Sequence, residues 1–159
     1  MNFRVGFGFD VHKLEENQPF WIGGIQVPHT KGAIGHSDAD VLVHAICDAL
    51  LGAANLGDIG LHFPDTSADF KGIDSKLLLK DCVKLLKEKG YSIGNVDATV
   101  SLQKPKLRPH IAEMSRVMAG VMEIDEDLVS VKATTTEKLG FVGREEGVSA
   151  HAVALIFKS

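Results

Sequence analysis

The chain has 159 residues, 45% of them hydrophobic and 24% charged, which is typical of a globular domain and unlike disordered or membrane-embedded proteins. Its 17 basic and 21 acidic residues give a formal net charge of −4, which argues against nucleic acid as a partner. A small phosphorylated ligand remains compatible with this charge. The sequence shows no repeat, linker, leader-like segment or apolar run long enough to span a bilayer. We therefore expect one domain over residues 1–159, with no membrane partner, in the cytoplasm or as a mature organellar form.

The first strand is predicted at residues 4–10 (RVGFGFD), where apolar residues alternate with small or polar ones as in a half-buried strand. Side chains two positions apart on a strand point to the same side, so Asp10 and His12 should project together. A carboxylate oxygen and an imidazole nitrogen suit an ion of the zinc type, which commonly takes three protein ligands and leaves a fourth position open. An Asp-x-His sequence alone is a weak signal, so a third ligand has to come from elsewhere.

The next segment is predicted to form a hairpin and then an amphipathic helix. A Gly-Gly pair at residues 23–24 separates two short β-prone runs, which favours a hairpin turn. Within residues 36–60, apolar positions recur at helical spacing after Ser37 or Asp38, either of which is a suitable N-cap. One side of this helix is therefore expected to pack against the rest of the protein.

The opposite side of the predicted helix carries Asp40, His44 and Asp48 at i, i+4 spacing. Taken alone, His44 is either a hydrogen-bonded surface group or a metal ligand. The second interpretation needs partners, and Asp10 and His12 are the candidates.

A long connection rich in Gly, Pro and Asp follows at residues 57–74. Its polar residues His62, Asp65 and Asp69 either serve a ligand or cap turns. Connections of this length inside compact domains are more often functional than idle, which favours a mobile flap.

Further helices are expected at residues 74–89 and 111–121, with a strand at residues 96–102 between them. Cys47 and Cys82 fall among apolar residues of predicted helices. Free cysteine usually behaves as a small hydrophobe in that setting, so both are expected to be reduced and buried.

Two loops that follow predicted strands are rich in groups that bind phosphate. Residues 103–109 hold three cations around two prolines, which serve either a phosphate or solubility. A strand at residues 128–133 leads into residues 134–144, where hydroxyls, a carboxylate, cations and turn glycines offer donors for phosphate and a hard ligand for magnesium or manganese. The last strand, residues 148–157, is largely apolar, as in a strand buried on both faces or packed against another subunit.

The chain resembles the 2-C-methyl-D-erythritol 2,4-cyclodiphosphate synthase family of the non-mevalonate isoprenoid pathway. Four motifs carry the resemblance, and they are DVH at residues 10–12, HSDADVLVHA at 36–45, GDIGLHFPDT at 57–66 and KATTTEKLGFVGR at 132–144. The resemblance extends essentially from end to end. It implies a single-domain α+β sandwich: a mixed four-stranded main sheet with helices on one face, plus a small β-hairpin. It also implies a homotrimer with the sheets facing the threefold axis and active sites between subunits.

The resemblance implies a role for each matching residue. The ligands of one zinc ion per active site would be Asp10, His12 and His44, and a second divalent ion, magnesium or manganese, would bind Glu137; these groups would also face the substrate. His36 and Thr135 would align and stabilise the reacting phosphates. The methylerythritol phosphate moiety would lie against Ser37, Asp58, Ile59, Gly60, Phe63 and Asp65. The cytidine, its phosphates and the adjoining pocket would involve Leu102, Lys104, Pro105, Lys106, Leu107, Arg108, Thr134, Thr135, Thr136, Phe141 and Arg144.

The implied reaction is a metal-dependent cyclisation by a phosphorus–oxygen lyase. In 4-diphosphocytidyl-2-C-methyl-D-erythritol 2-phosphate, the 2-phosphate attacks the β-phosphorus, expels CMP and closes the cyclic diphosphate. Because the nucleophile is already ionised, catalysis can rest on positioning and charge neutralisation. Family members also have a central cavity that accommodates isoprenoid diphosphates, with the residue matching Arg144 near its mouth. The chain departs from the family pattern at His151, where a glutamate can occur, and at Leu102, which replaces a common alanine.

Two other functions fit the same residues when the resemblance is set aside. A zinc-dependent hydrolase would use the metal to lower the pKa of bound water and would need a general base, for which Asp40 or Asp48 is available. Either carboxylate could equally orient His44. A non-catalytic trimeric binding protein would hold a structural metal with four protein ligands, and the donor-rich loop at residues 134–144 argues against it.

Overall fold

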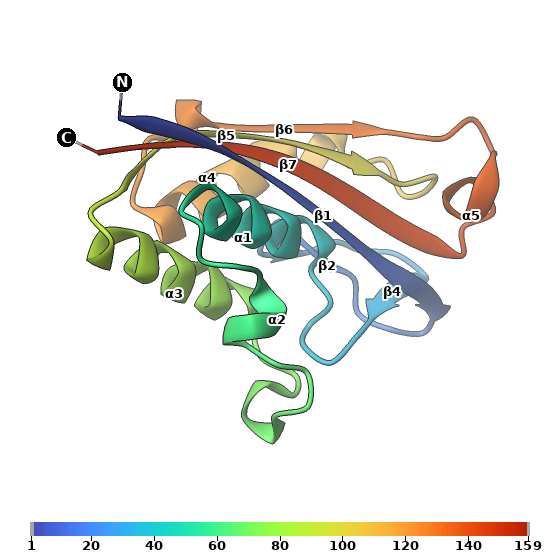
Figure 1. The fold of residues 1–159 in the computed structure, drawn as a ribbon. Coiled ribbons are helices and arrows are strands. Elements are labelled where there is room, and N and C mark those ends of the chain that lie inside the picture. Colours follow the sequence, from blue (N-terminus) through green and yellow to red (C-terminus); the bar gives the residue numbers. More distant parts are fainter. Residues whose placement is uncertain (1, 159) are drawn as a thin grey trace.

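The computed structural model describes residues 2–158, which form a mixed sheet with helices layered on one face (Figure 1). The sheet has five strands in the order β4-β1-β7-β5-β6. Their bounds are β1 Phe3–Glu16, β4 Lys31–Ile34, β5 Ser92–Ser101, β6 Val129–Thr134 and β7 Gly147–Phe157, and a separate hairpin joins β2 Trp21–Ile22 to β3 Ile25–Gln26. The helices are α1 Val41–Ala53, α2 Ile59–His62, α3 Ser75–Glu88, α4 Ile111–Met122 and α5 Gly140–Gly143, with 3₁₀ turns at Ala68–Phe70, Arg108–His110 and Glu126–Leu128.

The α+β class and the mixed sheet are confirmed, but the predicted number of four main strands is wrong. β1 pairs antiparallel with β7, β7 antiparallel with β5, and β5 parallel with β6. The fifth strand is β4, which pairs antiparallel with the last residues of β1, from Lys13 to Glu16. β4 is only four residues long and contains a glycine, so it lacks a clear alternation. It finds a partner because β1 continues six residues beyond the predicted end at Asp10.

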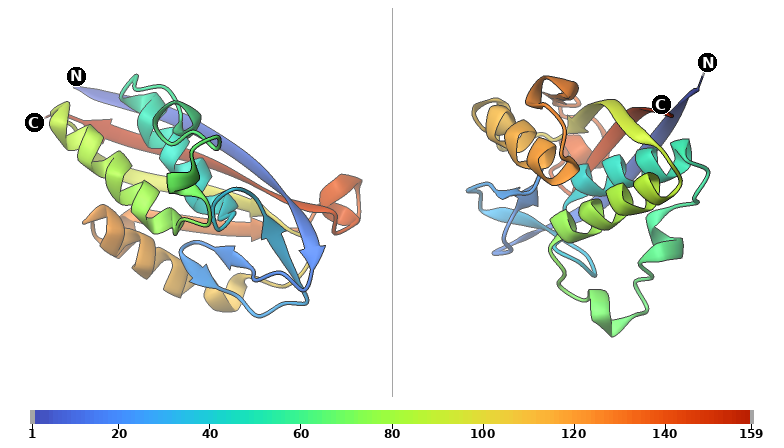
Figure 2. Two further views of the ribbon diagram at one scale, coloured as in Figure 1. Left: turned by 90° about the horizontal axis from the view of Figure 1, so that it is seen from below. Right: turned by 90° about the vertical axis from the view of Figure 1, so that its left-hand side faces the viewer.

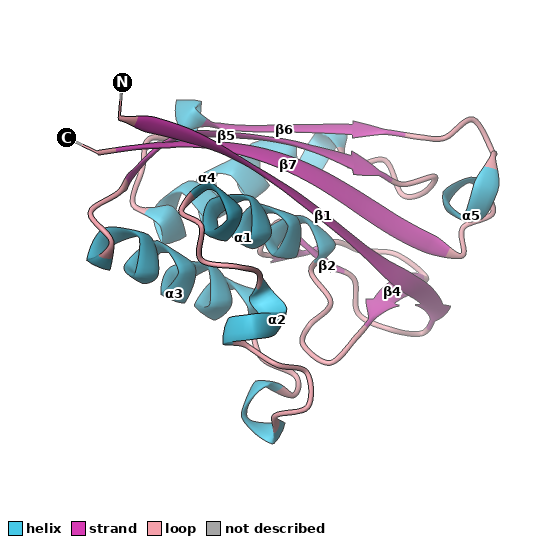
Figure 3. Ribbon diagram, in the orientation of Figure 1, coloured by secondary structure: helices cyan, strands magenta, loops and turns pink. Residues whose placement is uncertain are grey.

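The helices α1, α2, α3 and α4 lie on one side of the sheet, and α5 lies beyond the end of β6 and the start of β7 (Figures 2 and 3). α1 packs against β1 and β7, α4 packs against β6, and α3 contacts both α1 and α4. α1 is consequently covered almost all round, and most residues from Val41 to Leu51 are buried. The buried apolar side chains of these elements form one continuous core. None of the described helices is both long and apolar enough to cross a membrane.

β1 alternates as predicted, but the covered side is the glycine side. A Cβ built on Gly6 would lie 1.9 Å from the Ala49 carbonyl oxygen, and one built on Gly8 would lie 1.9 Å from that of Ala45. The backbones of β1 and α1 therefore approach so closely that only glycine fits between them. Asp10 and His12 share this side with the glycines, because they follow Gly8 at intervals of two residues.

The opposite side of β1 and β7 forms an apolar surface, here named the free sheet face. On β1 its members Val5, Phe7 and Phe9 are 62%, 61% and 47% exposed. On β7, Val153 and Phe157 are also exposed. The last strand is therefore not buried on both faces within one chain, and the alternative that it packs against another subunit remains a prediction.

The N-cap of α1 is Asp40, so the prediction of Ser37 or Asp38 is wrong. One carboxylate oxygen of Asp40 accepts from the Val43 amide at 3.0 Å and from the Gly23 amide at 2.9 Å, and the other accepts from the Gly24 amide at 2.7 Å. Gly23 and Gly24 form the predicted hairpin turn and have positive φ angles of 64° and 80°. A buried carboxylate thus caps the helix and satisfies two donors of the turn at once.

The two other predicted helices and the cysteines agree with the sequence, whereas the short helices α2 and α5 lie in segments that were predicted as loops. α3 begins after Asp74, whose side chain accepts from the Lys76 amide, and it ends before Gly90, which has a φ of 85°. Cys47 and Cys82 are buried and free, as expected for reduced core residues.

Candidate active site

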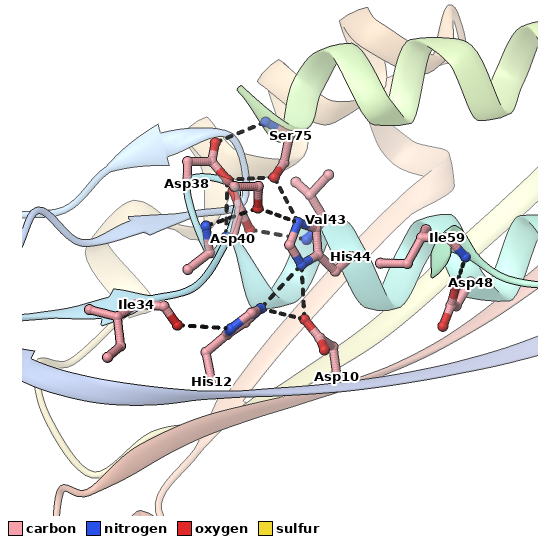
Figure 4. Close-up of polar contacts among 12 residues, drawn as sticks. Asp10, His12, Ile34, Asp38, Asp40, Val43, His44, Asp48, Ile59 and Ser75 are labelled. Carbon is pink, nitrogen blue, oxygen red and sulfur yellow. Dashed lines mark hydrogen bonds and ion pairs between the residues drawn. The ribbon is translucent and has the colours of Figure 1, made fainter. Parts of the chain in front are cut away.

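Three polar side chains from β1 and α1 converge at one point (Figure 4). Asp10 Oδ2 lies 2.9 Å from His12 Nε2 and 3.0 Å from His44 Nδ1. The two imidazole nitrogens are 3.2 Å apart. The predicted partnership of His44 with Asp10 and His12 is therefore present. The interpretation of His44 as a hydrogen-bonded surface group is wrong, because its side chain is buried.

The hydrogen bonds around this cluster leave its inner atoms as electron-pair donors. His12 Nδ1 donates to the Ile34 carbonyl oxygen at 3.2 Å, so a neutral His12 ring presents a lone pair at Nε2. That lone pair faces the Asp10 carboxylate, and two acceptors at such a distance repel each other unless a cation lies between them. Four ligands with the bond lengths of zinc, about 2.0–2.1 Å, place neighbouring ligand atoms about 3.3 Å apart in a tetrahedron. Separations of 2.9 to 3.2 Å among the three atoms fit such an ion with one position open.

The charges of the cluster shift the pKa values of Asp10 and His44 in opposite directions. Burial alone would raise the pKa of Asp10, but hydrogen bonds and charge from His12 and His44 lower it to about 2. Burial alone would lower the pKa of His44, yet the hydrogen bond and the negative charge of Asp10 raise it. The Asp10 carboxylate is therefore ionised at physiological pH. Its negative charge favours a positive charge at the two histidines, which either a proton or a metal ion can supply.

The cluster opens into a cavity of about 410 Å³ between β1, α1 and the connection after α1. The predicted site residues that line it are Asp10, His12, His36, Ser37, His44, Ile59, Gly60, Phe63 and Asp65. It is also lined by Gly35, Phe70, Ile73 and Leu78, which no sequence pattern distinguishes from core or turn residues. Asp58 is not among the lining residues, and its side chain instead accepts from the Leu61 amide and caps α2.

The two aspartates that flank His44 on α1 do not hydrogen-bond its ring. Asp40 is buried and serves as the cap of α1. Asp48 accepts from the Ile59 amide at 2.8 Å and so ties α2 to α1. The polar stripe predicted opposite the apolar positions therefore does not form an exposed surface. Its three members serve as a helix cap, as part of the Asp10–His12–His44 cluster and as a loop contact, because α1 is covered almost all round.

A second hollow of about 660 Å³ lies at the β5–β6 edge of the sheet, next to the start of α4. The predicted residues that line it are Leu102, Pro105, Lys106, Leu107, Arg108, Thr134 and Thr135, together with Gln103, Ile111, Val131, Lys132 and Ala133. Lys104, Thr136 and Glu137 lie in the adjoining loops, where Lys104 and Glu137 are exposed and Thr136 is half-buried. The Thr135 hydroxyl accepts from the Glu137 amide at 3.3 Å, which orders this loop.

The two hollows share no lining residue, and β7 separates β1 from β5 in the sheet. The structure thus brings the predicted site residues together in two groups and does not unite them within one chain. Phe141 belongs to neither group and lines a shallow hollow beside Val11 and His12. Arg144 pairs with Glu146 at 2.7 Å.

Comparisons with known proteins agree with this geometry. The model of the YgbB family matches residues 3–157. The 2-C-methyl-D-erythritol 2,4-cyclodiphosphate synthase of Bacteroides fragilis is 64% identical over 156 residues, which are 98% of each chain. That of Parabacteroides distasonis is 62% identical over 156 residues, 98% of this chain and 97% of the relative.

Solved structures share the fold. IspF of Plasmodium falciparum, in a complex with CDP, is 33% identical with a TM-score of 0.87, over 99% of this chain and 97% of that one. The bifunctional IspDF of Campylobacter jejuni is 43% identical with a TM-score of 0.95, over 99% of this chain, which spans 42% of that longer protein. Since the similarities run from one end of the sequence to the other, the chain belongs to the YgbB family and is an enzyme of the 2-C-methyl-D-erythritol 2,4-cyclodiphosphate synthases.

Proposed function

We propose that the chain converts 4-diphosphocytidyl-2-C-methyl-D-erythritol 2-phosphate to 2-C-methyl-D-erythritol 2,4-cyclodiphosphate with release of CMP, in a metal-dependent step of isoprenoid precursor synthesis. The observation that carries the proposal is the convergence of Asp10, His12 and His44 on the wall of a cavity, in a chain of this family. Residues 1–159 act as one domain in this proposal.

The cluster of Asp10, His12 and His44 is the proposed zinc site. Two imidazole nitrogens and a carboxylate oxygen are a donor set that zinc accepts, and three protein ligands leave a position for a substrate oxygen. Zinc bound there would supply Lewis acidity to a phosphate oxygen. The proposed ligand of the second ion is Glu137, because a carboxylate oxygen suits magnesium or manganese.

The residues around the first hollow are proposed to hold the methylerythritol phosphate moiety. His36 donates from Nε2 to the Ser67 carbonyl oxygen at 2.8 Å, which fixes the ring at the cavity wall. We assign His36 and Thr135 to the alignment of the reacting phosphates. Ser37 and Asp65, which also line the cavity, offer a hydroxyl and a carboxylate to the sugar-alcohol hydroxyls.

The second hollow is the proposed cytidine site. A solved relative is described as a CDP complex, which supports a ligand of the cytidine diphosphate type. Lys106 and Arg108 line this hollow, and Lys104 lies in the same loop. Three cations at one loop favour a diphosphate in spite of the acidic net charge of the chain.

A complete site then needs both hollows, and we propose that adjacent subunits of a homotrimer each supply one. The free sheet face supports an oligomer, because contiguous apolar surface of this kind is rarely left in water. In such a trimer the free sheet faces would surround the threefold axis and a central cavity. An isoprenoid diphosphate is the proposed occupant, with Arg144 near the mouth and His151 on the wall, its ring 4.9 Å from that of Phe9.

Phosphorus NMR of the protein with the diphosphocytidyl substrate, zinc and magnesium tests the reaction. CMP together with a cyclic diphosphate is the expected result. CMP together with an open-chain bisphosphate would mean that water is the acceptor, and the chain would then be a zinc-dependent hydrolase. Absence of turnover in a metal-loaded oligomer would overturn the proposal for this substrate and direct attention to Leu102 beside the base.

A further inference from the structure

A chain of hydrogen bonds connects the outer nitrogen of His44 with Ser75 and Asp38 (Figure 4). His44 Nε2 lies 2.8 Å from the hydroxyl oxygen of Ser75, the first residue of α3. That hydroxyl in turn contacts Asp38 Oδ1, and Asp38 Oδ2 accepts from the Ser75 amide at 2.9 Å. The chain thus joins α1, the start of α3 and the loop before α1.

The direction of each hydrogen bond in this chain follows from the fact that the Ser75 hydroxyl has only one proton to donate. An ionised carboxylate only accepts, so the Ser75 hydroxyl donates its one proton to Asp38. The Ser75 oxygen is then left with lone pairs and accepts from His44 Nε2. A His44 ring that donates from Nε2 carries its lone pair on Nδ1, and Nδ1 is the atom 3.0 Å from Asp10.

Ser75 has no access to the substrate. It is completely buried and does not line the cavity that the Asp10–His12–His44 cluster faces. Ser37 also lies near His44 Nε2, at 3.1 Å, but it lines the cavity and its oxygen accepts from the Ala39 amide. The difference in burial leaves Ser75 as a residue that can act only through His44.

We infer that Ser75, oriented by Asp38, is a positioning residue that fixes His44 in the tautomer with a free electron pair on Nδ1, and so prepares it to bind metal. This inference rests on the proposed zinc site. The other tautomer would point an N–H into the cluster and exclude an ion. Partners of this kind, which hydrogen-bond the outer nitrogen of a ligand, typically change metal affinity by about 10- to 100-fold.

The test compares zinc affinity, measured by competition with a chelating dye, in the wild type, Ser75→Ala and the control Ser92→Ala. Ser92 is an exposed serine at the start of β5, far from the cluster in the fold. We expect Ser75→Ala to bind zinc about 10- to 100-fold more weakly and Ser92→Ala to bind as the wild type does. Wild-type affinity in a folded Ser75→Ala protein would overturn the inference.

Nitrogen-15 NMR of the histidine rings in zinc-loaded wild-type protein is a second test, which does not depend on the variant folding. The expected spectrum has His44 bound to zinc through Nδ1, with a proton on Nε2 that exchanges slowly because it is buried. Coordination through Nε2, or a proton on Nδ1, would overturn the inference. If the wild type binds no zinc, the proposed metal site itself is wrong; if it binds zinc and Ser75→Ala binds equally well, only the role of Ser75 is wrong.

Discussion

Gly8 of β1 lies against the Ala45 carbonyl of α1 so closely that a Cβ at position 8 would stand 1.9 Å from that oxygen. This close approach lies next to the cluster of Asp10, His12 and His44, because Asp10 follows Gly8 by two residues and His44 precedes Ala45. The Asp10 carboxylate can reach His44 Nδ1 at 3.0 Å only while the two backbones stay together. The packing of a strand on a helix and the geometry of the site are therefore one property of the molecule.

Gly8→Ala should destabilise the protein and disturb the cluster. The added methyl group has to push backbone against backbone, and we expect a loss of about 3 kcal/mol in the free energy of unfolding, measured by urea denaturation. Gly52→Ala, in α1, is the matched control, because its Cβ would meet the Phe7 carbonyl oxygen at an ordinary 3.9 Å. The control should be neutral or more stable by up to about 1 kcal/mol, since alanine favours helix. Equal stability of the two variants would mean that β1 and α1 can separate without cost.

His12→Ala and His44→Ala should each abolish tight zinc binding and leave a folded protein. Each substitution removes one of the three proposed ligand atoms. The fold should persist because most of the apolar core lies away from these two side chains. Elemental analysis of the dialysed proteins measures the metal, and circular dichroism checks the fold. His110→Ala, in the turn before α4, controls for the loss of a histidine outside the cluster. Full zinc stoichiometry in either cluster variant would refute the ligand set.

Mixing two inactive variants should restore activity if each active site is shared between subunits. His44→Ala damages the first hollow, and Glu137→Gln damages the proposed site of the second ion. In every mixed trimer about one of the three sites would receive both intact halves, so we expect purified mixed trimers to release CMP at about one third of the wild-type rate. Each variant alone should be nearly inactive, and Glu137→Gln should keep its zinc. No recovery of activity in verified mixed trimers would place the whole site within one subunit. The control for the loss of a negative charge in Glu137→Gln is Glu88→Gln, at the exposed end of α3.

The pH dependence of stability should report the Asp10–His44 contact in metal-free protein. The pKa of Asp10 is lowered from 3.8 to about 2, so its contribution to stability is present above pH 3.8 and is lost as the pH falls towards 2. The pKa of His44 is raised from 6.5, so its contribution is present below pH 6.5 and is lost as the pH rises through the raised value. The difference in unfolding free energy between the wild type and Asp10→Asn, measured with a chelator, should therefore be largest between pH 3.8 and 6.5. A difference that does not vary with pH would contradict the contact.

The stabilisation of the protein by added zinc should increase with pH. Because the metal needs the electron pairs of His12 and His44, protons compete with it, and the stabilisation by added zinc should grow as the pH rises through the raised pKa of His44. Thermal unfolding with and without zinc measures this increment at each pH.

Several features of the fold could be predicted from the sequence because they depend on neighbours along the chain. The alternation of β1 places Asp10 and His12 on one side whatever packs against it. The Gly23-Gly24 turn and the helix after Asp74 follow from the backbone freedom of glycine and from the capping oxygen of aspartate. The motifs around residues 10–12, 36–45, 57–66 and 132–144 identified the family, as the comparisons later confirmed.

The tertiary structure decided which atoms meet. Alternation along β1 cannot tell that the glycine side is covered, since this depends on a backbone contact with a helix more than thirty residues later in the chain. Helical spacing in α1 puts Asp40, His44 and Asp48 on one side, but only packing against the hairpin, β1 and α2 makes the first a cap, the second a candidate ligand and the third a loop anchor. No local pattern marks Ser75 either, because its partner His44 is 31 residues away in sequence. Contacts between segments distant in the chain are set by packing, so propensity and periodicity, which are local, could not predict them.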